Sequence, residues 1–196
     1  VLVVTKRRVF VSRGGEKLEG ALLSVFSDKD TVRSKLRGRR AIDVGSSTGG
    51  FTDCLLSYEV SSVTAVDVGT AQFHPKLRSD SRVTLFENTD IRNFISVDTF
   101  DIIVADLSFI SLEKVLDHVL SFGESGSLYF LLIKPQFEVG FGNTKKGIVK
   151  DITLTDAVLE KYTGLFLEKE LHDVGTFPCT ITGGDGNQEY FIYARK

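Results

Sequence analysis

The residues best suited to bind a ligand lie in one glycine-rich stretch, Gly45-Ser46-Ser47-Thr48-Gly49-Gly50. It follows an apolar run at 41–44 that predicts a buried strand, and it precedes a segment at 51–56 with helical spacing. A strand, a glycine-rich turn and a helix bring backbone N–H groups close to a ligand at the carboxyl end of the strand. The missing Gly-Lys-Ser/Thr excludes a P-loop, and the glycines lack GxGxxG spacing. An ordinary tight turn is the alternative.

Two acidic residues that follow the next predicted strands suit a nucleoside ligand. Asp67 ends a strand at 62–69 and lies 24 positions after Asp43, where an acid can accept hydrogen bonds from ribose hydroxyls. Helix capping is the alternative for Asp67. Asp90 follows a strand at 82–87 and can meet an adenine amino group, although turn chemistry also explains it.

The spacing Asp43-x-Gly45-x-x-x-Gly49 is typical of the first turn of S-adenosylmethionine-dependent methyltransferases. We therefore predict S-adenosylmethionine as the cofactor, with its amino-acid end against residues 45–49. The candidate binding residues are Asp43, Gly45, Ser46, Ser47, Thr48, Gly49, Asp67, Val68, Asp90 and Asp106.

Three charged residues lie at the ends of predicted strands or at the start of a predicted helix. Asp106 follows a strand at 100–105, and Lys134 ends a strand at 128–133, where Pro135 biases it to extended geometry. Lys17 lies in the first turn of a predicted helix, where a cation opposes the helix dipole. Lys17 is therefore a candidate for function, and a solvent-exposed lysine is the alternative.

The elements that must position these residues alternate along the chain. Strands are predicted at 41–44, 62–69, 82–87, 100–105, 128–133, within 171–182 and at 188–195. Helices are predicted after residue 15, at 51–56, at 72–78 with Pro75 as a limit, around 112–119 and at 155–167, while 29–40 reads as a basic connector. The alternation predicts a doubly wound α/β fold. We expect the seven-stranded, Rossmann-like methyltransferase sheet, mostly parallel with a C-terminal antiparallel strand.

Positive charge is concentrated at the start of the chain. Residues 1–40 hold 11 Lys and Arg against 4 Asp and Glu, whereas residues 41–196 hold 13 against 22. This distribution predicts that the basic segment faces a polyanion, together with Lys145 and Lys146 of a glycine- and lysine-rich loop at 138–150. Such loops at the edge of a sheet often act as mobile lids. A solvated basic face is the alternative.

Composition limits the setting of the protein. No apolar run approaches the ~18 residues of a transmembrane helix, and no signal peptide is recognisable. Cys54 and Cys179 are too far apart to form a disulfide framework or a metal-binding spacing. We expect a reduced, cytoplasmic setting and no metal.

The sequence begins at Val1 and contains no Met, so we expect it to be part of a longer natural chain. Residues 1–11 (VLVVTKRRVFV) predict one or two short strands and resemble the end of a preceding module. We therefore expect a tail or linker at 1–11 and a methyltransferase domain at 12–196.

Eight stretches together resemble one known family. They are SRGGEKLEGAL at 12–22, DVGSSTGGFTDCLL at 43–56, AVDVGTAQ at 65–72, LRSDSRV at 77–83, ADLSFISL at 105–112, LIKPQFE at 132–138, KKGIVKD at 145–151 and GGDGNQEYF at 183–191. They are similar to the TlyA or hemolysin A family of FtsJ-like ribosomal RNA 2′-O-methyltransferases. The resemblance implies ribosomal RNA or a ribosomal subunit as partner, and an RNA-binding module that would precede residue 12.

The resemblance also implies a catalytic tetrad of Lys17, Asp106, Lys134 and Glu189. A ribose 2′-hydroxyl is a poor nucleophile until its proton is removed or strongly hydrogen-bonded. A lysine amine is ordinarily protonated at neutral pH, and it can act as a base only when burial or a second cation favours its neutral form. In this tetrad Asp106 and Glu189 would orient the lysines but favour their charged form, so the two effects oppose each other.

Two other classes of function remain open from the sequence. A non-enzymatic hemolysin or membrane-active protein would need a membrane-spanning run or an amphipathic cationic helix, and the sequence offers neither. We therefore expect no membrane partner. A dehydrogenase would need the GxGxxG turn, and the Lys-Pro-Gln-Phe strand end at 134–137 also argues against it.

Overall fold

Seven strands form one mixed sheet in the computed structural model, which describes residues 9–196. The strand order is β3-β2-β1-β4-β5-β7-β6, and β7 runs antiparallel to both of its neighbours. The strands are β1 (Arg40–Val44), β2 (Ser62–Val66), β3 (Val83–Phe86), β4 (Phe100–Ala105), β5 (Gly123–Ile133), β6 (His172–Pro178) and β7 (Tyr190–Arg195). The chain order reverses between β1 and β4, which places the first strand–helix turn at the switch point of the sheet. The predicted doubly wound fold is confirmed.

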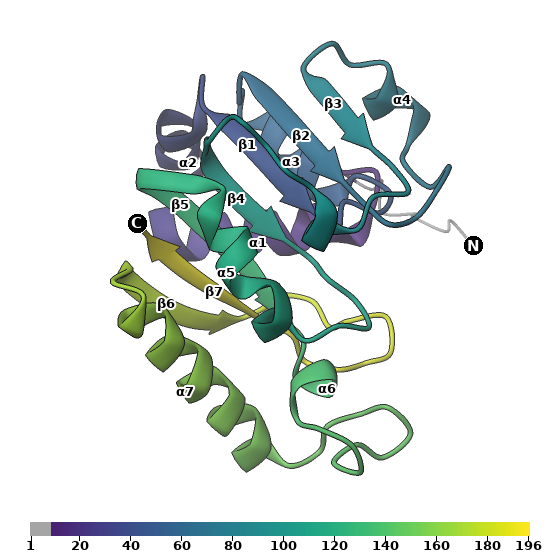
Figure 1. Cartoon of the computed structure of the whole chain (residues 1–196), viewed down its shortest axis with the longest axis vertical. Helices are drawn as coiled ribbons and strands as arrows, with labels where there is room; N and C mark the ends of the chain where they lie inside the picture. Colours follow the sequence, from purple (N-terminus) through teal and green to yellow (C-terminus); the bar gives the residue numbers. More distant parts are fainter. Residues whose placement is uncertain (1–8) are drawn as a thin grey trace, which may run out of the picture.

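Helices cover both faces of this sheet, with α1 behind it and α5 in front of it in Figure 1. They are α1 (Arg13–Phe26), α2 (Lys29–Leu36), α3 (Gly50–Ser57), α4 (Pro75–Arg78), α5 (Leu116–Ser121), α6 (Pro135–Glu138) and α7 (Ile152–Glu168), with two short 3-10 turns, η1 (Ile91–Asn93) and η2 (Leu112–Val115).

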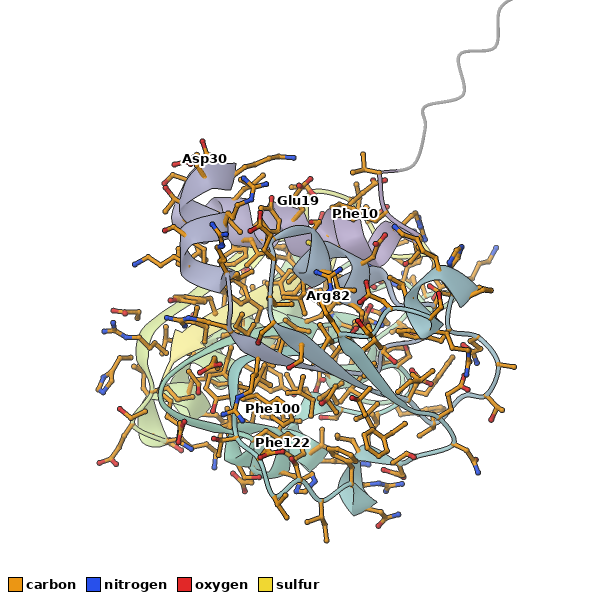
Figure 2. The ribbon with its side chains drawn as sticks, turned by 90° about the horizontal axis from the view of Figure 1, so that it is seen from above. Phe10, Glu19, Asp30, Arg82, Phe100 and Phe122 are labelled. Carbon is orange, nitrogen blue, oxygen red and sulfur yellow. The ribbon has the colours of Figure 1, made fainter. Side chains whose placement is uncertain are left out.

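Side-chain alternation along the strands builds two cores. In β4, Ile102 and Val104 pack toward the first three helices, whereas Ile103 and Ala105 pack toward α5 and α7. Figure 2 shows the same division, with Phe10 on one side of the sheet and Phe100 and Phe122 on the other. Strands buried on both faces explain the near-continuous apolar runs of the sequence.

Helix α1 carries an apolar stripe, of which Leu18, Ala21 and Leu22 are buried. Lys17 shares the buried side of the helix and is only 7% exposed. Because the helix already begins at Arg13, Lys17 is its fifth residue rather than part of its first turn. The inward direction of a lysine on an apolar face is the first structural sign that it has a specific partner.

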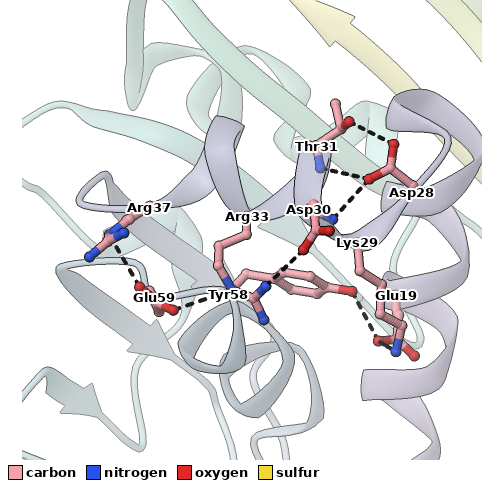
Figure 3. A network of polar contacts seen from close by, with 9 residues as sticks. All are labelled: Glu19, Asp28, Lys29, Asp30, Thr31, Arg33, Arg37, Tyr58 and Glu59. Atoms are coloured by element: carbon pink, nitrogen blue, oxygen red, sulfur yellow. Dashed lines mark hydrogen bonds and ion pairs between the residues drawn. The ribbon is translucent and has the colours of Figure 1, made fainter.

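The predicted basic connector at 29–40 was wrong for most of its length, because residues 29–36 form α2. Asp28 caps the helix by accepting hydrogen bonds from the backbone N–H groups of Asp30 and Thr31, both at 2.9 Å. Arg33 and Arg37 both pair with Glu59, at 3.2 Å each (Figure 3). Much of this basic charge is therefore neutralised within the protein.

The position of α2 also limits what its charges can do. It leads into Arg40, the first residue of β1, and so lies at the amino end of the parallel strands. The glycine-rich turn lies at the opposite end, about 13 Å away along the strand. Residues 33–40 therefore lie at the edge of the sheet opposite to this turn, and the expectation that the basic segment faces a polyanion stays a prediction.

Two smaller expectations also differ from the structure. The strands predicted at 1–11 lie mostly outside the described residues, and Val9–Val11 form none. The helix predicted at 72–78 begins at Pro75, because proline suits the first helical position and His74 caps it through Lys76 N–H at 3.2 Å.

Hydrogen bonds around Glu138 and Tyr162 connect the segments that follow β4 and β5 to helix α7. The carboxylate of Glu138 accepts hydrogen bonds from Ser111 Oγ (2.7 Å), Leu112 N–H (2.9 Å) and Tyr162 Oη (2.8 Å). The Tyr162 hydroxyl also accepts a hydrogen bond from Glu113 N–H at 2.9 Å. Helix α7 thereby connects α6 to η2. Because α6 directly follows Lys134 and η2 comes soon after Asp106, these contacts also position the chain just beyond both residues.

Tyr162→Phe should lower the free energy of unfolding by about 1–3 kcal/mol, because it leaves Glu113 N–H without this partner and removes a donor to Glu138. Urea unfolding measures the change. The control is Tyr190→Phe, since the Tyr190 hydroxyl makes no hydrogen bond within residues 9–196. Equal effects of the two substitutions would contradict a bridging role for Tyr162.

Candidate functional site

Two ion pairs lie at the carboxyl edge of the sheet; the first is buried, and in the second Lys134 is buried while Asp106 is partly exposed. Lys17 from α1 pairs with Glu189, and their side chains are 9% and 4% exposed. Lys134 Nζ lies 2.5 Å from Asp106 Oδ1 and donates a hydrogen bond to Ser108 Oγ at 2.8 Å. Charged groups this deeply buried need partners, because an unpaired buried charge costs several kcal/mol. The four predicted tetrad residues therefore occur as two matched pairs.

Strand register brings the two pairs together. Ile133 of β5 is opposite Tyr190 of β7, so the next position along these antiparallel strands places Lys134 beside Glu189. The thiol of Cys179 is within electrostatic range of all four charges. Burial raises the pKa of this thiol to about 12, with smaller effects of the two lysines lowering it and of the two acids raising it.

Two cavities adjoin these pairs. The larger has a volume of about 410 Å³ and the smaller about 210 Å³, and Gly45, Ser47 and Asp106 line both. Of the other predicted cofactor residues, the larger cavity is lined by Asp67, Val68 and Asp90, and the smaller by Asp43, Ser46 and Thr48. Lys17 also lines the smaller cavity. Nine of the ten predicted cofactor residues thus line one hollow region or the other.

Asp43 is the most deeply buried acid of the site. Its Oδ2 accepts hydrogen bonds from Thr52 N–H (3.0 Å) and Thr52 Oγ1 (2.7 Å). Its Oδ1 and the nearby Ser46 Oγ are buried without a hydrogen-bond partner among residues 9–196. Burial raises the pKa of Asp43 from 3.8 to about 7, the Thr52 hydroxyl opposes the rise, and Asp106 and Asp67 add to it. Unpartnered buried acceptors fit a ligand that brings a positively charged hydrogen-bond donor.

Asp67 organises the glycine-rich turn. Its two carboxylate oxygens accept hydrogen bonds from Ser47 N–H (2.7 Å) and Gly69 N–H (2.6 Å). Ser47 has a left-handed backbone with φ 48°, which this contact helps to hold. Each carboxylate oxygen keeps a further lone pair, so Asp67 can still accept hydrogen bonds from a ligand.

Asp90 lies in the larger cavity but is already bound to a neighbour. It accepts a hydrogen bond from Arg92 N–H at 2.9 Å and pairs with the Arg92 guanidinium. These contacts lower the pKa of Asp90 to about 2. Asp90 therefore makes the local turn contacts that were the alternative explanation for it. An adenine amino group that donated to Asp90 would share its carboxylate with Arg92.

Two glycines of the turn have different structural roles. Gly45 has φ 80°, and a Cβ atom there would lie 2.5 Å from the carbonyl oxygen of Asp106. Gly45 therefore allows β1 and β4 to end side by side. Gly49 lines neither cavity; it closes the turn by donating from its N–H to Ser46 O at 2.7 Å, and a side chain there would collide with Leu77.

Sequence reasoning missed two polar side chains at this edge. Ser108 hydrogen-bonds to Lys134, and its spacing of two from Asp106 was the available signal. Asn187 is 2% exposed and lies two residues before Glu189, in the stretch 183–191 that contributed to the family resemblance. Neither residue type is rare enough in loops to be noticed without the fold.

Metal and membrane features are absent from the described part of the chain. Residues 9–196 contain no group of three or more His, Cys, Asp or Glu side chains that could hold a metal ion. No helix among them is long and apolar enough to span a membrane.

Comparison with known proteins gives a consistent result. Residues 10–196 match the FtsJ-like methyltransferase family. The chain is 37% identical over 198 residues to the 16S/23S rRNA (cytidine-2′-O)-methyltransferase TlyA of Mycobacterium tuberculosis, covering 99% of this chain and 71% of TlyA. It is 35% identical over 190 residues to Hemolysin A of Brachyspira hyodysenteriae, covering 94% of this chain and 76% of that protein. The solved structure of a protein of Streptococcus thermophilus named as a hemolysin has a TM-score of 0.87 and 35% identity, covering 97% of this chain and 68% of that one.

The raised pKa of Asp43 predicts that Asp43→Asn stabilises the protein, increasingly so as pH rises. Between pH 3.8 and about 7 the folded state keeps a proton that the unfolded chain has lost, so stability falls as pH increases across this range. Asparagine keeps the acceptor for Thr52 and has no charge to bury. We expect a gain that is small near pH 4 and reaches about 3–4 kcal/mol at pH 8.

Urea unfolding at pH 4, 6 and 8 without ligand measures this gain. The exposed Asp156 on α7 provides the control, because Asp156→Asn removes no buried charge. A gain for Asp43→Asn that is the same at all three pH values would contradict the buried charge as its cause.

Proposed function

Because the chain belongs to the FtsJ-like methyltransferase family, which includes TlyA and hemolysin A, we propose that it methylates ribose 2′-hydroxyls of ribosomal RNA. Membership makes the protein a methyltransferase with a methyl donor of the S-adenosylmethionine type, and hydride transfer by a dehydrogenase no longer applies. The RNA substrate comes from the name of the M. tuberculosis relative. The observation that carries the proposal is the Lys134–Asp106 pair next to the Lys17–Glu189 pair, because Asp106 lines both cavities and Lys17 lines the smaller one.

We assign the donor, S-adenosylmethionine, to the two cavities. The turn at 45–49 would receive its amino-acid end, with the unpartnered Asp43 Oδ1 and Ser46 Oγ as acceptors for its ammonium group. Asp67 would accept hydrogen bonds from its ribose hydroxyls, and Asp90 would lie near its adenine. When bound, the donor supplies a methyl group on a sulfonium centre, which needs only in-line placement against a nucleophile.

The nucleophile in this proposal is the 2′-oxygen of the target ribose, and Lys134 is the residue that contacts it. Asp106 and Ser108 hold two directions of the Lys134 Nζ, which leaves a third direction free for the hydroxyl. The Lys134 ammonium group first loses a proton to solvent, and the neutral amine then takes the 2′-proton as the methyl group is transferred. Glu189 and Lys17 flank the Lys134 side of the site and orient the sugar. Residues 12–196 form the methyltransferase domain in this assignment.

A test of Lys134 separates a base from a fixed positive charge. Lys134→Arg keeps the charge but cannot offer a neutral base at ordinary pH, and Lys134→Ala loses both properties. If Lys134 takes the proton, both variants should lose methyl transfer by about 10²–10⁴-fold with nearly intact cofactor affinity. The assay uses ribosomal RNA and labelled S-adenosylmethionine. An arginine variant with most of the wild-type activity would refute the base assignment.

Asp67 offers a separate test of the cofactor site. Asp67→Ala should weaken binding of S-adenosylhomocysteine by about 1–3 kcal/mol, since it removes a charged acceptor and frees Ser47 N–H. Calorimetric titration measures the affinity. Asp80→Ala serves as control because Asp80 lies outside both cavities and pairs with Arg82. An Asp67 variant with wild-type affinity would remove Asp67 from the site.

A further inference from the structure

The loop that follows α6 ends in a closed turn at residues 145–148, here called the lysine turn. Lys145 N–H donates to Ile148 O (2.9 Å) and Ile148 N–H donates to Lys145 O (3.1 Å). The two central residues, Lys146 (φ 53°) and Gly147 (φ 78°), are both left-handed, as in the tightest two-residue hairpin turns. The lysine turn is thus a defined structure within an otherwise irregular loop.

The buried side chain of Asn187 holds this turn against the body of the protein. Asn187 Nδ2 donates to Gly147 O at 2.9 Å, and Asn187 Oδ1 accepts from Val149 N–H at 3.0 Å. One side-chain amide thereby donates a hydrogen bond to the loop backbone and accepts another from it, as the backbone of a neighbouring strand does. The side chain is 2% exposed, and these two bonds give its buried polar atoms partners.

Asn187 is also tied to the candidate catalytic acid. Residues 187 and 189 are both buried while Gln188 between them is exposed, so Asn187 and Glu189 face the same side of the chain. Gly183 N–H donates to Asn187 O at 2.8 Å, and a Cβ atom on Gly183 would lie 2.5 Å from Glu189 Oε1. The lysine turn, the 183–187 turn and Glu189 therefore pack as one unit.

The charges of the lysine turn are free to bind a partner. Lys145, Lys146 and Lys150 are exposed and form no ion pair within residues 9–196. Arg33 of α2 and Arg37 just after it, by contrast, are paired with Glu59 at the amino edge of the sheet. Cations without an internal partner gain most from phosphate groups, since no existing pair is broken.

We propose that Asn187 is a positioning residue for the RNA substrate, and this inference rests on the function proposed above. It fixes the lysine turn at a set place relative to Glu189. The turn binds a phosphate next to the target nucleotide, and the fixed geometry delivers the 2′-hydroxyl to Lys134. Without Asn187 the same lysines remain on a loop that no longer has a fixed position.

Asn187→Ala is the direct test, with methylation of ribosomal RNA measured at varied RNA concentration. We expect KM for RNA to rise by about tenfold or more, with kcat reduced less and the affinity for S-adenosylhomocysteine unchanged. Hydrogen exchange of residues 145–149 should become faster, because two hydrogen bonds are removed. Asn187→Asp keeps the acceptor for Val149 N–H but loses the donor to Gly147 O, and it should show an increase in KM as well. If the alanine variant does not fold, the aspartate variant decides.

A second measurement concerns the charges themselves. Replacing Lys145 and Lys146 together by alanine should reduce the log–log salt slope of RNA binding by roughly 0.7–0.9 for each RNA phosphate that the two lysines neutralise. The matched control is Lys35→Ala with Arg39→Ala, which removes the same charge at the amino end of the sheet, also from residues without an ion pair in the described chain.

Three outcomes would contradict the inference. One is an unchanged KM for RNA in the Asn187 variants although exchange at 145–149 has increased. Another is an equal reduction of the salt slope in the control pair, which would mean a general effect of charge. The third is a weakened cofactor affinity in Asn187→Ala, which would make the residue a general support of the site. An inactive wild-type enzyme on RNA would instead refute the proposed function, so the two failures can be told apart.

Discussion

Two lysine ammonium groups are buried at the carboxyl edge of the sheet, and the structure depends on giving each of them a carboxylate. Lys17 and Lys134 cannot be removed from water alone, because an unpaired buried charge costs more than a small domain can spare. Their partners, Glu189 and Asp106, come from distant parts of the chain. The pairing therefore requires the first helix, the ends of two central strands and the start of the last strand to meet at one edge.

The antiparallel last strand makes this meeting possible. In a purely parallel sheet every strand would end at the carboxyl edge, and the residue before a strand would lie at the far edge. Because β7 runs antiparallel to β5, its beginning lies beside the end of β5, and this places Glu189 next to Lys134 in the sheet. Gly45 positions Asp106 in a similar way, because a side chain at residue 45 would collide with the backbone of Asp106, and only glycine lets β1 and β4 end in contact. The acids and lysines are thus positioned by backbone register more than by loops.

Local patterns in the sequence predicted most of the sheet, while features that depend on distant partners were harder to foresee. The strand at 100–105 was predicted to the residue because it is apolar throughout and buried on both faces. Helix α2 was missed because only Val32 and Leu36 of its eight residues are buried, so it has almost no apolar periodicity. Asp43 was predicted from its spacing to Gly45 and Gly49, and Asp67 and Asp106 from their places after predicted strands; all three line a cavity. Glu189 came only from the family resemblance, since its role depends on a register between strands far apart in sequence.

The signs of the charges divide this edge into two sides. Asp67 and Asp106 both act electrostatically on Asp43, and all three acids line the cavities, a setting that favours a ligand with positive groups. The unpaired lysines of the 145–150 loop lie on the outside, held by Asn187, and suit a polyanion. The buried ion pairs lie between, each combining one charge of either sign. A methyl donor that carries a cation and a substrate that carries phosphates would therefore approach from different sides, and the lysine–carboxylate pairs mark where they meet.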